Sequence, residues 1–323
     1  MADSTTVAAP TRALIIANPA SGTHSPELVA RTEELCSAFL DAVTVHHTTA
    51  PEDATDAVRA ALAAPGPRPD LVIAVGGDGT VREVVQALSG RPEAALFIVP
   101  GGTGNSYYRM LWGDRPWSEA LKSVFADGAP DGTVRPRPLD LALLAETDRV
   151  VCLGSCSGVI ADALITARDI PLVGKARYAR AFADTARDYP PYPGRVTVDG
   201  RVVHEGPTVL ANVGGGRYRG GQYLILPHSR LDDGLLDVCV IGEGTTAAEV
   251  PGLSLTAAHL DRPGTVYARG RKITVERTDG RRLPLEHDGE YQHDIGGTAT
   301  FHVLPGALTA WAPAEDPATT ITD

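Results

Sequence analysis

The sequence predicts an α/β protein in which a doubly wound parallel-sheet nucleotide-binding domain precedes a second, β-rich antiparallel sandwich domain. At 323 residues the chain exceeds the roughly 100 to 200 residues of one average domain. Its first hundred residues alternate between apolar, strand-like runs and amphipathic, helix-like runs, which indicates a parallel sheet covered on both faces. The turn-forming segment DGAPDGTVRPRP, residues 127–138, ends this alternation, and short β-rich runs follow it.

The strands and helices of the first domain are predicted from the spacing of apolar residues and from residues that begin or end helices. Residues 13–17, 71–75 and 95–99 are continuous apolar runs, as strands buried on both faces require. Ser25 and Pro26 begin the first helix, and Pro65 ends the second. The expected strands are residues 12–19, 43–49, 70–75 and 95–100, and the expected helices are residues 25–42, 51–65 and 80–90.

The second domain is expected to consist mainly of short antiparallel strands. Asp199 and Gly200 separate two alternating runs and therefore predict a hairpin. One helix, residues 174–189, interrupts the strands. The expected strands are residues 139–144, 149–156, 195–206, 208–213, 222–227, 235–241, 272–277, 299–304 and 308–313.

Composition and charge exclude several classes of protein. A net charge of -11 argues against a nucleic-acid partner, because such proteins need a concentrated basic face. The sequence has neither a leader-like N-terminus nor a run of about 18 apolar residues, so we expect a cytoplasmic protein. Cys152 and Cys156 lie in an apolar run and are expected to be buried thiols. Residues 1–10 and 315–323 are expected to be flexible tails.

The segment AVGGDGTVREVV carries the first functional signal. Val81, Val84, Val85 and Leu88 have helical spacing, so a helix begins directly after the glycines. A strand that ends at a helix N-terminus presents free backbone N–H groups and the positive end of the helix dipole, which together favour a phosphate. Asp78 would repel that phosphate unless a cation such as Mg²⁺ lies between them or a hydroxyl proton must be removed; both are kinase chemistry. Taken alone, the segment is equally well explained as a tight turn.

Two further loops strengthen the phosphate interpretation. NPASG, residues 18–22, follows the first strand, and GGTGN, residues 101–105, follows the strand at 95–100. Because the carboxyl ends of parallel strands meet at one edge of a sheet, we expect the three loops to converge there. The chain has no Walker A sequence, which excludes a P-loop enzyme.

Five motifs in this order, NPASG, GGDGTVREVV, PGGTGN, LDDGLLDVCVI and HDGE, resemble those of the diacylglycerol kinase catalytic-domain family, which includes bacterial soluble lipid kinases and sphingosine kinases. GGDGT alone is shared with NAD kinases and phosphofructokinases. The resemblance runs from about Leu14 to Trp311. It implies an ATP site in the cleft between the two domains and a last strand that returns to the first. The domains are then residues 11–136 with 298–314, and residues 137–297.

The resemblance also implies roles for individual residues. Asp78 matches an aspartate tied to catalytic Mg²⁺, and Glu290 matches the acceptor of the substrate hydroxyl proton. Asp288 belongs to the same acidic group, and Asp140 matches an aspartate near the acceptor alcohol. A structural Mg²⁺ is implied at Asp233 with the backbone carbonyls of Arg230 and Leu235. The positions implied to contact ATP are Asn18, Ser21, Gly22, Thr48, Gly76, Gly77, Gly79, Thr80, Glu83, Gly102, Thr103 and Asn105.

Several of these residues have simpler interpretations. The segments 288–289 and 232–234 are also typical of turns. The histidines lack metal-ligand spacing and are expected to be exposed or capping; they are His46, His47, His287 and His293. The aromatic residues after the third loop are interpreted as core, with a pocket floor as the alternative; they are Tyr107, Tyr108, Trp112 and Trp117.

Two positions depart from the family pattern. Ser106 stands where many members carry aspartate, although sphingosine kinases also lack that aspartate. Arg82 stands where many carry asparagine, which would add a cation near the phosphates. The effect of Ser106 and Arg82 on activity stays open.

The resulting hypothesis is an ATP- and Mg²⁺-dependent kinase acting on a lipid alcohol such as diacylglycerol or a sphingoid or related long-chain alcohol. Two alternatives stay open: a kinase of the same fold acting on a small non-lipid hydroxyl metabolite, and a non-catalytic nucleotide-binding regulator. The acidity of the chain and the lack of an obvious basic or amphipathic membrane-binding helix make the metabolite kinase a serious alternative to the lipid kinase. A transient membrane surface, with a peripheral location, and a homodimer are further partners left open.

Overall fold

The computed structural model describes residues 9–22, 25–126 and 133–314. Two compact units divide the chain at Leu139/Asp140 and again at Pro305/Gly306, so that unit 1 contains both ends and unit 2 the middle. From the sequence, the two domain boundaries are expected at 136/137 and 297/298. The tails expected at 1–10 and 315–323 lie outside the described residues, apart from positions 9 and 10.

Unit 1 is built on a parallel sheet with the strand order β2-β1-β3-β4. The C-terminal part of a long strand, β18, adds to the sheet in parallel beside β4, where Ala310 pairs with Leu96. The expected return of the last strand is therefore present. The bounds are β1 Arg12–Ala17, β2 Ala42–His47, β3 Leu71–Gly76, β4 Ala95–Pro100 and β18 Thr298–Pro313.

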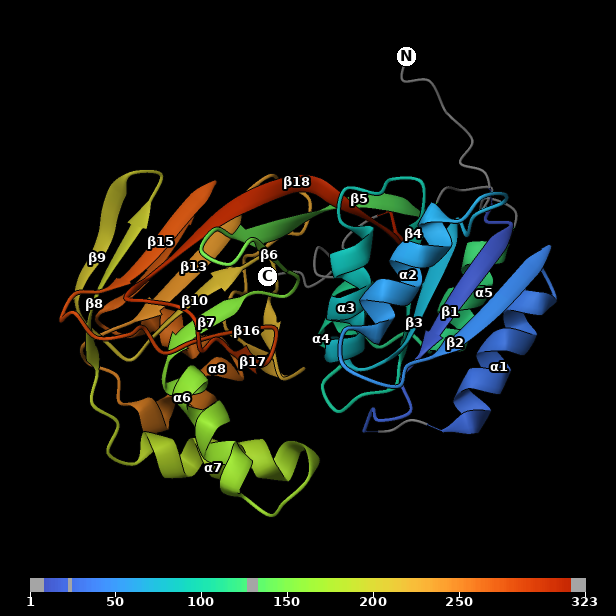
Figure 1. Cartoon of the computed structure of the whole chain (residues 1–323). Helices are drawn as coiled ribbons and strands as arrows, with labels where there is room; N and C mark the ends of the chain where they lie inside the picture. Colours follow the sequence, from blue (N-terminus) through green and yellow to red (C-terminus); the bar gives the residue numbers. More distant parts are fainter. Residues whose placement is uncertain (1–8, 23–24, 127–132, 315–323) are drawn as a thin grey trace. The chain divides into compact units, whose positions relative to one another are not determined.

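Helices cover both faces of this sheet, with α2 and α3 on one side and α1 and α5 on the other (Figure 1). Ser25 caps α1 as expected, because its Oγ accepts the Leu28 N–H at 3.1 Å; such a cap contributes about 1 kcal/mol. The helix after the second glycine motif begins at Asp78, two residues before the expected start. The bounds are α1 Pro26–Ser37, α2 Asp53–Ala63, α3 Asp78–Leu88, α4 Ser106–Trp112 and α5 Trp117–Phe125.

Helix α4 confirms the core interpretation of its aromatic residues. Tyr107, Tyr108 and Trp112 are all buried. The sequence did not predict α4 or α5, because seven and nine residues are too few for a helical period to be distinguished from other apolar runs.

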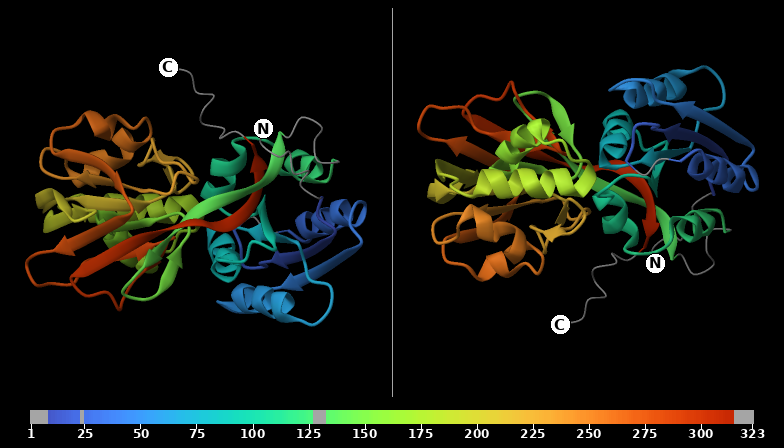
Figure 2. Two further views of the ribbon diagram at one scale, coloured as in Figure 1. Left: turned by 90° about the horizontal axis from the view of Figure 1, so that it is seen from above. Right: turned by 90° about the horizontal axis from the view of Figure 1, so that it is seen from below.

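Unit 2 is a sandwich of two antiparallel layers. In the first layer the N-terminal part of β18 is followed by β15, β8 and β9, and β5 runs beside β18, as Figure 2 shows. Asp199 and Gly200 both have positive φ at the β8–β9 turn, which confirms the predicted hairpin. The bounds are β5 Val134–Leu144, β6 Arg149–Val151, β8 Tyr192–Val198, β9 Arg201–Thr208 and β15 Lys272–Arg277.

The second layer has the strand order β14-β13-β10-β7-β16-β17. Val196 and Phe301 of the first layer pack against Val213 and Val238 of the second and form the main core of the unit. The bounds are β7 Ser155–Gly158, β10 Leu210–Gly214, β13 Leu236–Ile241, β14 Thr265–Gly270, β16 Leu285–His287 and β17 Glu290–Tyr291.

Two helices cover the outer face of this second layer. Val159 of α6 and Phe182 of α7 pack against Leu210 and Ile241. The sequence did not predict α6, whose residues are almost all apolar and so show no helical stripe. The expected strand 222–227 is shorter in the structure, where only β12 is extended. The remaining bounds are α6 Val159–Thr166, α7 Gly174–Ala186, α8 Val250–Ser254, β11 Tyr218–Arg219, β12 Tyr223–Leu224 and three 3₁₀ turns, Ala167–Asp169, Ala247–Glu249 and Ala258–Asp261.

The helices and the cysteines of the described residues bear on two further expectations. Across the described ranges, no helix combines the length and the apolar character that crossing a membrane requires. All four cysteines are free and buried, as expected for Cys152 and Cys156.

Candidate functional site

The three glycine-bearing loops of unit 1 meet at the carboxyl edge of the sheet. The Asn18 side chain, after β1, donates a hydrogen bond from Nδ2 to Oγ1 of Thr80 in α3 at 3.0 Å. The Gly101 N–H, after β4, donates to the carbonyl of Gly76 at 2.8 Å. The predicted convergence of the loops is therefore confirmed.

Close approach of the loops explains most of their glycines. A Cβ on Gly77 would lie 3.0 Å from the Cα of Gly102, and a Cβ on Gly102 would overlap Gly77. A Cβ on Gly76 would overlap the side chain of Thr80. Gly79 is different, because a Cβ there would have no atom within 4 Å. Packing within the unit does not require glycine at position 79, which is exposed in the first turn of α3.

Asp78 joins two helix N-termini. It is the first residue of α3, and its carboxylate accepts the backbone N–H groups of Ser106 at 3.0 Å and Tyr107 at 3.2 Å, at the start of α4. Both helix dipoles stabilise a negative charge at this point. A carboxylate has about four acceptor positions, so two N–H bonds are compatible with a metal ligand. Asp78 therefore fits the predicted role of holding Mg²⁺.

Ser106 and Arg82, the two departures from the family pattern, are both buried. Ser106 contributes its backbone N–H to Asp78, so this contact does not depend on the side chain that differs. The Arg82 guanidinium lies 3.8 Å from the carboxylate of Glu83, its neighbour on α3.

Other residues of unit 1 that the sequence predicts to contact ATP form hydrogen bonds that shape the loops. The Asn105 side chain accepts the Gly102 N–H and donates to the Gly102 carbonyl, each at 2.9 Å, while its backbone has a φ of 51°. Ser21 donates from Oγ to the Asn18 carbonyl at 2.9 Å. The Thr48 N–H donates to the Ala17 carbonyl at 2.9 Å, beside the first loop.

Two other positions also belong to this network. The Glu83 carboxylate accepts the Ala54 N–H at 3.3 Å, in the first turn of α2. A Cβ on Gly22 would lie 2.9 Å from Oγ1 of Thr103, so the first and third loops touch.

In unit 2 the HDGE motif forms the turn between β16 and β17, which confirms the turn interpretation. Asp288 has a φ of 50° and is buried, and its carboxylate accepts three backbone N–H groups: Cys152 at 2.9 Å, Leu153 at 2.6 Å and Gly154 at 3.2 Å. Burial by itself would raise the pKa of Asp288, but His287 and these N–H groups outweigh it and hold the pKa below its ordinary value. In this structure Asp288 anchors the turn. The expectation that His287 is exposed or capping was wrong, because this side chain is buried beside Asp288.

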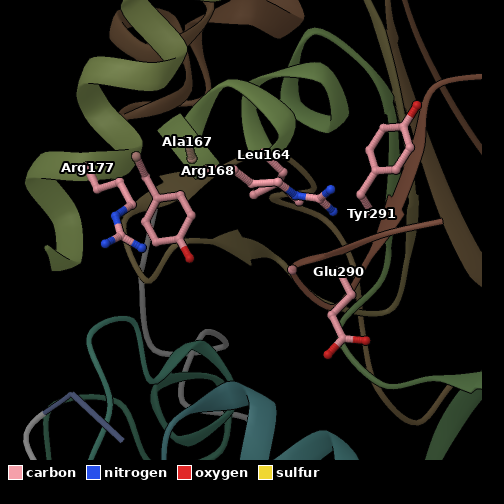
Figure 3. A pocket seen from close by; sticks show the side chains of 8 residues that line it. Leu164, Ala167, Arg168, Arg177, Glu290 and Tyr291 are labelled. Atoms are coloured by element: carbon pink, nitrogen blue, oxygen red, sulfur yellow. The ribbon is translucent and has the colours of Figure 1, made fainter. Parts of the chain in front are cut away.

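Glu290 follows the same turn but is exposed. It lines a pocket of about 380 Å³ in unit 2, into which the loop after α6 and the first turn of α7 contribute Arg168 and Arg177 (Figure 3). The other residues that line the pocket are Leu164, Ala167, Tyr178, Gly289 and Tyr291. Within unit 2, Glu290 is thus the predicted catalytic carboxylate that faces open space.

Asp140 serves the LDDG loop. It is buried, its Oδ2 accepts the Gly234 N–H at 2.6 Å, and its own N–H donates to the Leu231 carbonyl at 2.5 Å. It is not among the residues that line the pocket with Glu290. The geometry is that of a residue that positions a loop.

Asp233 has an arginine as its counter-ion. Its Oδ1 accepts the Leu235 N–H at 3.1 Å, and its Oδ2 pairs with the guanidinium of Arg269. The same guanidinium lies 3.2 Å from the buried carboxylate of Asp237. Among the residues with described positions, no group of three or more His, Cys, Asp and Glu side chains is placed to hold a metal. Arg269 thus supplies the charge opposite Asp233 in this structure, and the structural Mg²⁺ expected at Asp233, Arg230 and Leu235 stays a prediction.

Sequence reasoning missed Glu286 and Arg219, which lie behind the HDGE turn. Glu286 is buried, its Oε2 accepts the Gly289 N–H at 2.9 Å, and its Oε1 lies 3.7 Å from the Arg219 guanidinium. Burial raises the pKa of Glu286, and the nearby Arg219 opposes this rise. Arg219 also donates from Nε to Asn212 at 2.8 Å. The position of Glu286, directly before HDGE, was the only available signal.

Fold and comparisons together define the class of protein: a kinase with glycine-bearing loops at the carboxyl edge of a parallel sheet, followed by a β-sandwich domain. Residues 12–131 match the family model "Diacylglycerol kinase catalytic domain". Residues 155–312 match "YegS C-terminal NAD kinase beta sandwich-like domain". The chain belongs to the diacylglycerol kinase family, and it is an ATP-dependent phosphotransferase.

Individual relatives agree with this membership. The chain is 32% identical over 250 residues to "Probable lipid kinase YegS-like" of Pseudomonas aeruginosa, which covers 76% of this chain and 78% of that protein. It is 28% identical over 290 residues to the diacylglycerol kinase of Bacillus subtilis, covering 87% and 90% respectively. A crystal structure of a diacylglycerol kinase from Bacillus anthracis str. Sterne is similar in fold, with a TM-score of 0.66 at 23% identity over 96% of this chain and 98% of that one.

Proposed function

We propose that this kinase transfers the terminal phosphoryl group of ATP to a hydroxyl of a lipid alcohol, such as diacylglycerol or a sphingoid or related long-chain alcohol. The observation that carries the proposal is the junction at Asp78, where the N-termini of α3 and α4 meet at one carboxylate. Phosphoryl transfer depends mainly on positioning and on neutralisation of charge, and this junction provides both.

Unit 1 supplies the nucleotide contacts in this proposal. The phosphates bind at the N-terminus of α3, where the first backbone N–H groups have no partner within the helix. Gly79 lets them approach closely, because no side chain occupies that position. Asp78 would hold Mg²⁺, which when bound neutralises phosphate charge and orients the terminal phosphate. Asn18 and Thr103, from the neighbouring loops, complete the polar rim.

Unit 2 supplies the proton acceptor. Glu290 is the exposed carboxylate of the pocket and would accept the proton of the attacking hydroxyl. Asp288 and Glu286 hold the turn that carries Glu290, through hydrogen bonds to the backbone of residues 152–154 and of Gly289. The geometry therefore separates one candidate base from two anchoring carboxylates.

One observation favours a second candidate, a small polar hydroxyl compound as the acceptor. The pocket at Glu290 is lined by Arg168, Arg177 and two tyrosines, which suits a polar molecule as well as the head of a lipid. We place the lipid first because the relatives carry the names of lipid kinases and diacylglycerol kinases.

Labelled ATP tests the two acceptors directly. The purified protein, with Mg²⁺, is incubated with diacylglycerol or sphingoid bases in mixed micelles and, separately, with pools of polar metabolites. A labelled product that partitions into organic solvent is expected. A labelled product only in the aqueous phase supports the polar acceptor, and tight ATP binding without transfer to any alcohol supports a regulator.

A further inference from the structure

The loop that joins α6 to α7, together with the first turns of α7, forms an exposed surface that we call the docking segment, residues 168–180. Leu172, Val173 and Tyr178 expose 43, 80 and 52% of their surface there. The other large apolar side chains that the described part of the chain exposes are isolated from one another in sequence: Phe39, Val202 and Leu255. Single exposed apolar residues are ordinary, whereas a cluster marks an interaction surface.

The charge of the docking segment has the opposite sign to that of the protein. Four basic residues of the segment, Arg168, Lys175, Arg177 and Arg180, outnumber its one acidic residue, Asp169, although the chain as a whole carries -11. Arg180 is paired with Asp184 of the same helix at 2.6 Å, so the basic excess rests on Arg168, Lys175 and Arg177. Apolar side chains beside basic ones are the pattern of a surface that binds an anionic bilayer. A symmetric dimer through this segment would bring two basic surfaces together, which charge repulsion opposes.

The docking segment is held in place by the buried face of α7 and by a hydrogen bond within the segment. Ala181 and Ala186 of α7 are buried, and Phe182 packs on the outer face of the sandwich. Arg177 donates from Nε to the Leu172 carbonyl at 2.5 Å and so ties the loop to the helix. The loop that carries Leu172 and Val173 is therefore held by α7, which itself packs on the sandwich. The two side chains are exposed although the loop is held in this way.

The same segment borders the pocket of Glu290. Arg168, Arg177 and Tyr178 belong to the docking segment and also line that pocket (Figure 3). We propose that residues 168–180 dock the kinase on an anionic lipid bilayer, with Leu172 and Val173 among the acyl chains and the basic side chains at the head groups. Docking brings the pocket to the lipid surface, where a lipid alcohol presents its hydroxyl. This inference rests on the proposed lipid-kinase function.

Sedimentation with vesicles tests docking without any kinase reaction. The full-length protein is centrifuged with vesicles of phosphatidylcholine alone, or with added phosphatidylglycerol, in the absence of ATP. We expect binding to the anionic vesicles, reduced at least tenfold in the double variant Leu172→Asp/Val173→Asp. The variant Lys175→Gln should weaken binding about fivefold at low salt, since a basic residue near an anionic surface contributes about 1 kcal/mol. The matched control is Val202→Asp/Leu255→Asp, which adds two charges at exposed apolar positions elsewhere in unit 2 and should bind like the unaltered protein.

Several outcomes overturn the proposal. They are failure of the unaltered protein to sediment, equal sedimentation of the Leu172/Val173 variant, and equal loss in the control. Analytical ultracentrifugation in lipid-free buffer identifies the competing occupant: a dimer that the Leu172/Val173 variant dissociates would assign the surface to a second copy. A thermal melt of each variant shows that the fold is retained, which we expect because the substituted side chains are exposed. Since no phosphate transfer is measured, a protein that docks but phosphorylates no lipid would refute the proposed function and leave docking intact.

Discussion

The carboxylate of Asp78, the first residue of α3, accepts the backbone N–H of Ser106, the first residue of α4, at 3.0 Å. This hydrogen bond connects the loop after β3 to the loop after β4. Because the donor is the backbone N–H of residue 106, this hydrogen bond does not depend on the side chain at that position. The acidic residue that many relatives carry there is therefore not needed to hold the two loops together.

Asp78→Asn should remove activity and leave the fold intact. An asparagine offers one acceptor oxygen in place of two, so one of the N–H groups of α4 loses its partner at a cost of about 1 kcal/mol. Loss of the charge that would hold Mg²⁺ should lower the turnover of ATP at least ~100-fold. Turnover and thermal unfolding are measured together. Asp114→Asn, at an exposed position of unit 1, is the control, and normal turnover in the Asp78 variant would rule out its role.

Gly79→Ala separates packing from ligand approach. A Cβ at this position meets no protein atom within 4 Å, and alanine is the better helix former by up to ~1 kcal/mol, so stability should be equal or higher. ATP affinity should nevertheless fall, because the methyl group would occupy the space that the phosphates need. Isothermal titration with ATP and Mg²⁺ measures this. Gly252→Ala in α8 is the matched control, since a Cβ there is equally free; unchanged ATP affinity in the Gly79 variant would place the phosphates elsewhere.

Glu290→Gln should slow the chemical step and spare nucleotide binding. Removing a general base typically costs a factor of about 10² to 10⁴ in rate. The loops expected to bind ATP belong to unit 1, so the dissociation constant of ATP should not change. Steady-state kinetics with the acceptor identified by labelled ATP give kcat and KM separately. Asp294→Asn, an exposed neighbour in the same unit, should behave like the unaltered protein; a loss confined to ATP affinity would contradict the assignment of Glu290 as base.

Asp288 should make stability depend on acid. Its pKa in the folded protein lies below the ordinary value, so its charge contributes stability that is fully present above the unfolded pKa of about 3.9 and is lost as pH falls through the folded pKa. Asp288→Asn should cost about 1 to 3 kcal/mol at neutral pH, because buried N–H groups lose a charged acceptor.

Denaturant unfolding followed by circular dichroism between pH 7 and pH 3 measures this dependence. The difference in unfolding free energy between the unaltered protein and the Asp288 variant should narrow below about pH 4, where the carboxyl group of the unfolded unaltered chain takes up a proton while that of the folded protein is still charged. A difference that stays constant down to pH 3 would show that the charge of Asp288 does not stabilise the turn.

Local sequence was sufficient for much of unit 1. The strands β1, β3 and β4 are buried apolar runs, and α1 carries its own cap at Ser25, so each could be predicted from a window of neighbouring residues. The convergence of the loops followed from strand direction alone. The short helix α4 and the almost wholly apolar helix α6 carry no periodic signal, and they form because surrounding elements bury them.

The docking segment is a second feature that local sequence did not predict. The sequence shows no obvious basic or amphipathic membrane-binding helix, and this kept a non-lipid acceptor open as an alternative. Only the fold shows that Leu172 and Val173 are exposed beside basic residues, because exposure depends on which face of α7 the sandwich covers.

By itself the sequence determined the alternation of β1 to β4 with α1 to α3 in unit 1, the three phosphate-type loops and the family motifs, since these depend on residues close together in the chain. The tertiary structure decided what each acidic residue does. Asp288 is held by the N–H of Cys152, 136 positions away, and Asp233 pairs with Arg269, whereas Glu290 remains exposed. Burial and counter-charge set the chemistry of a carboxylate, and both come from residues that only folding brings to its side.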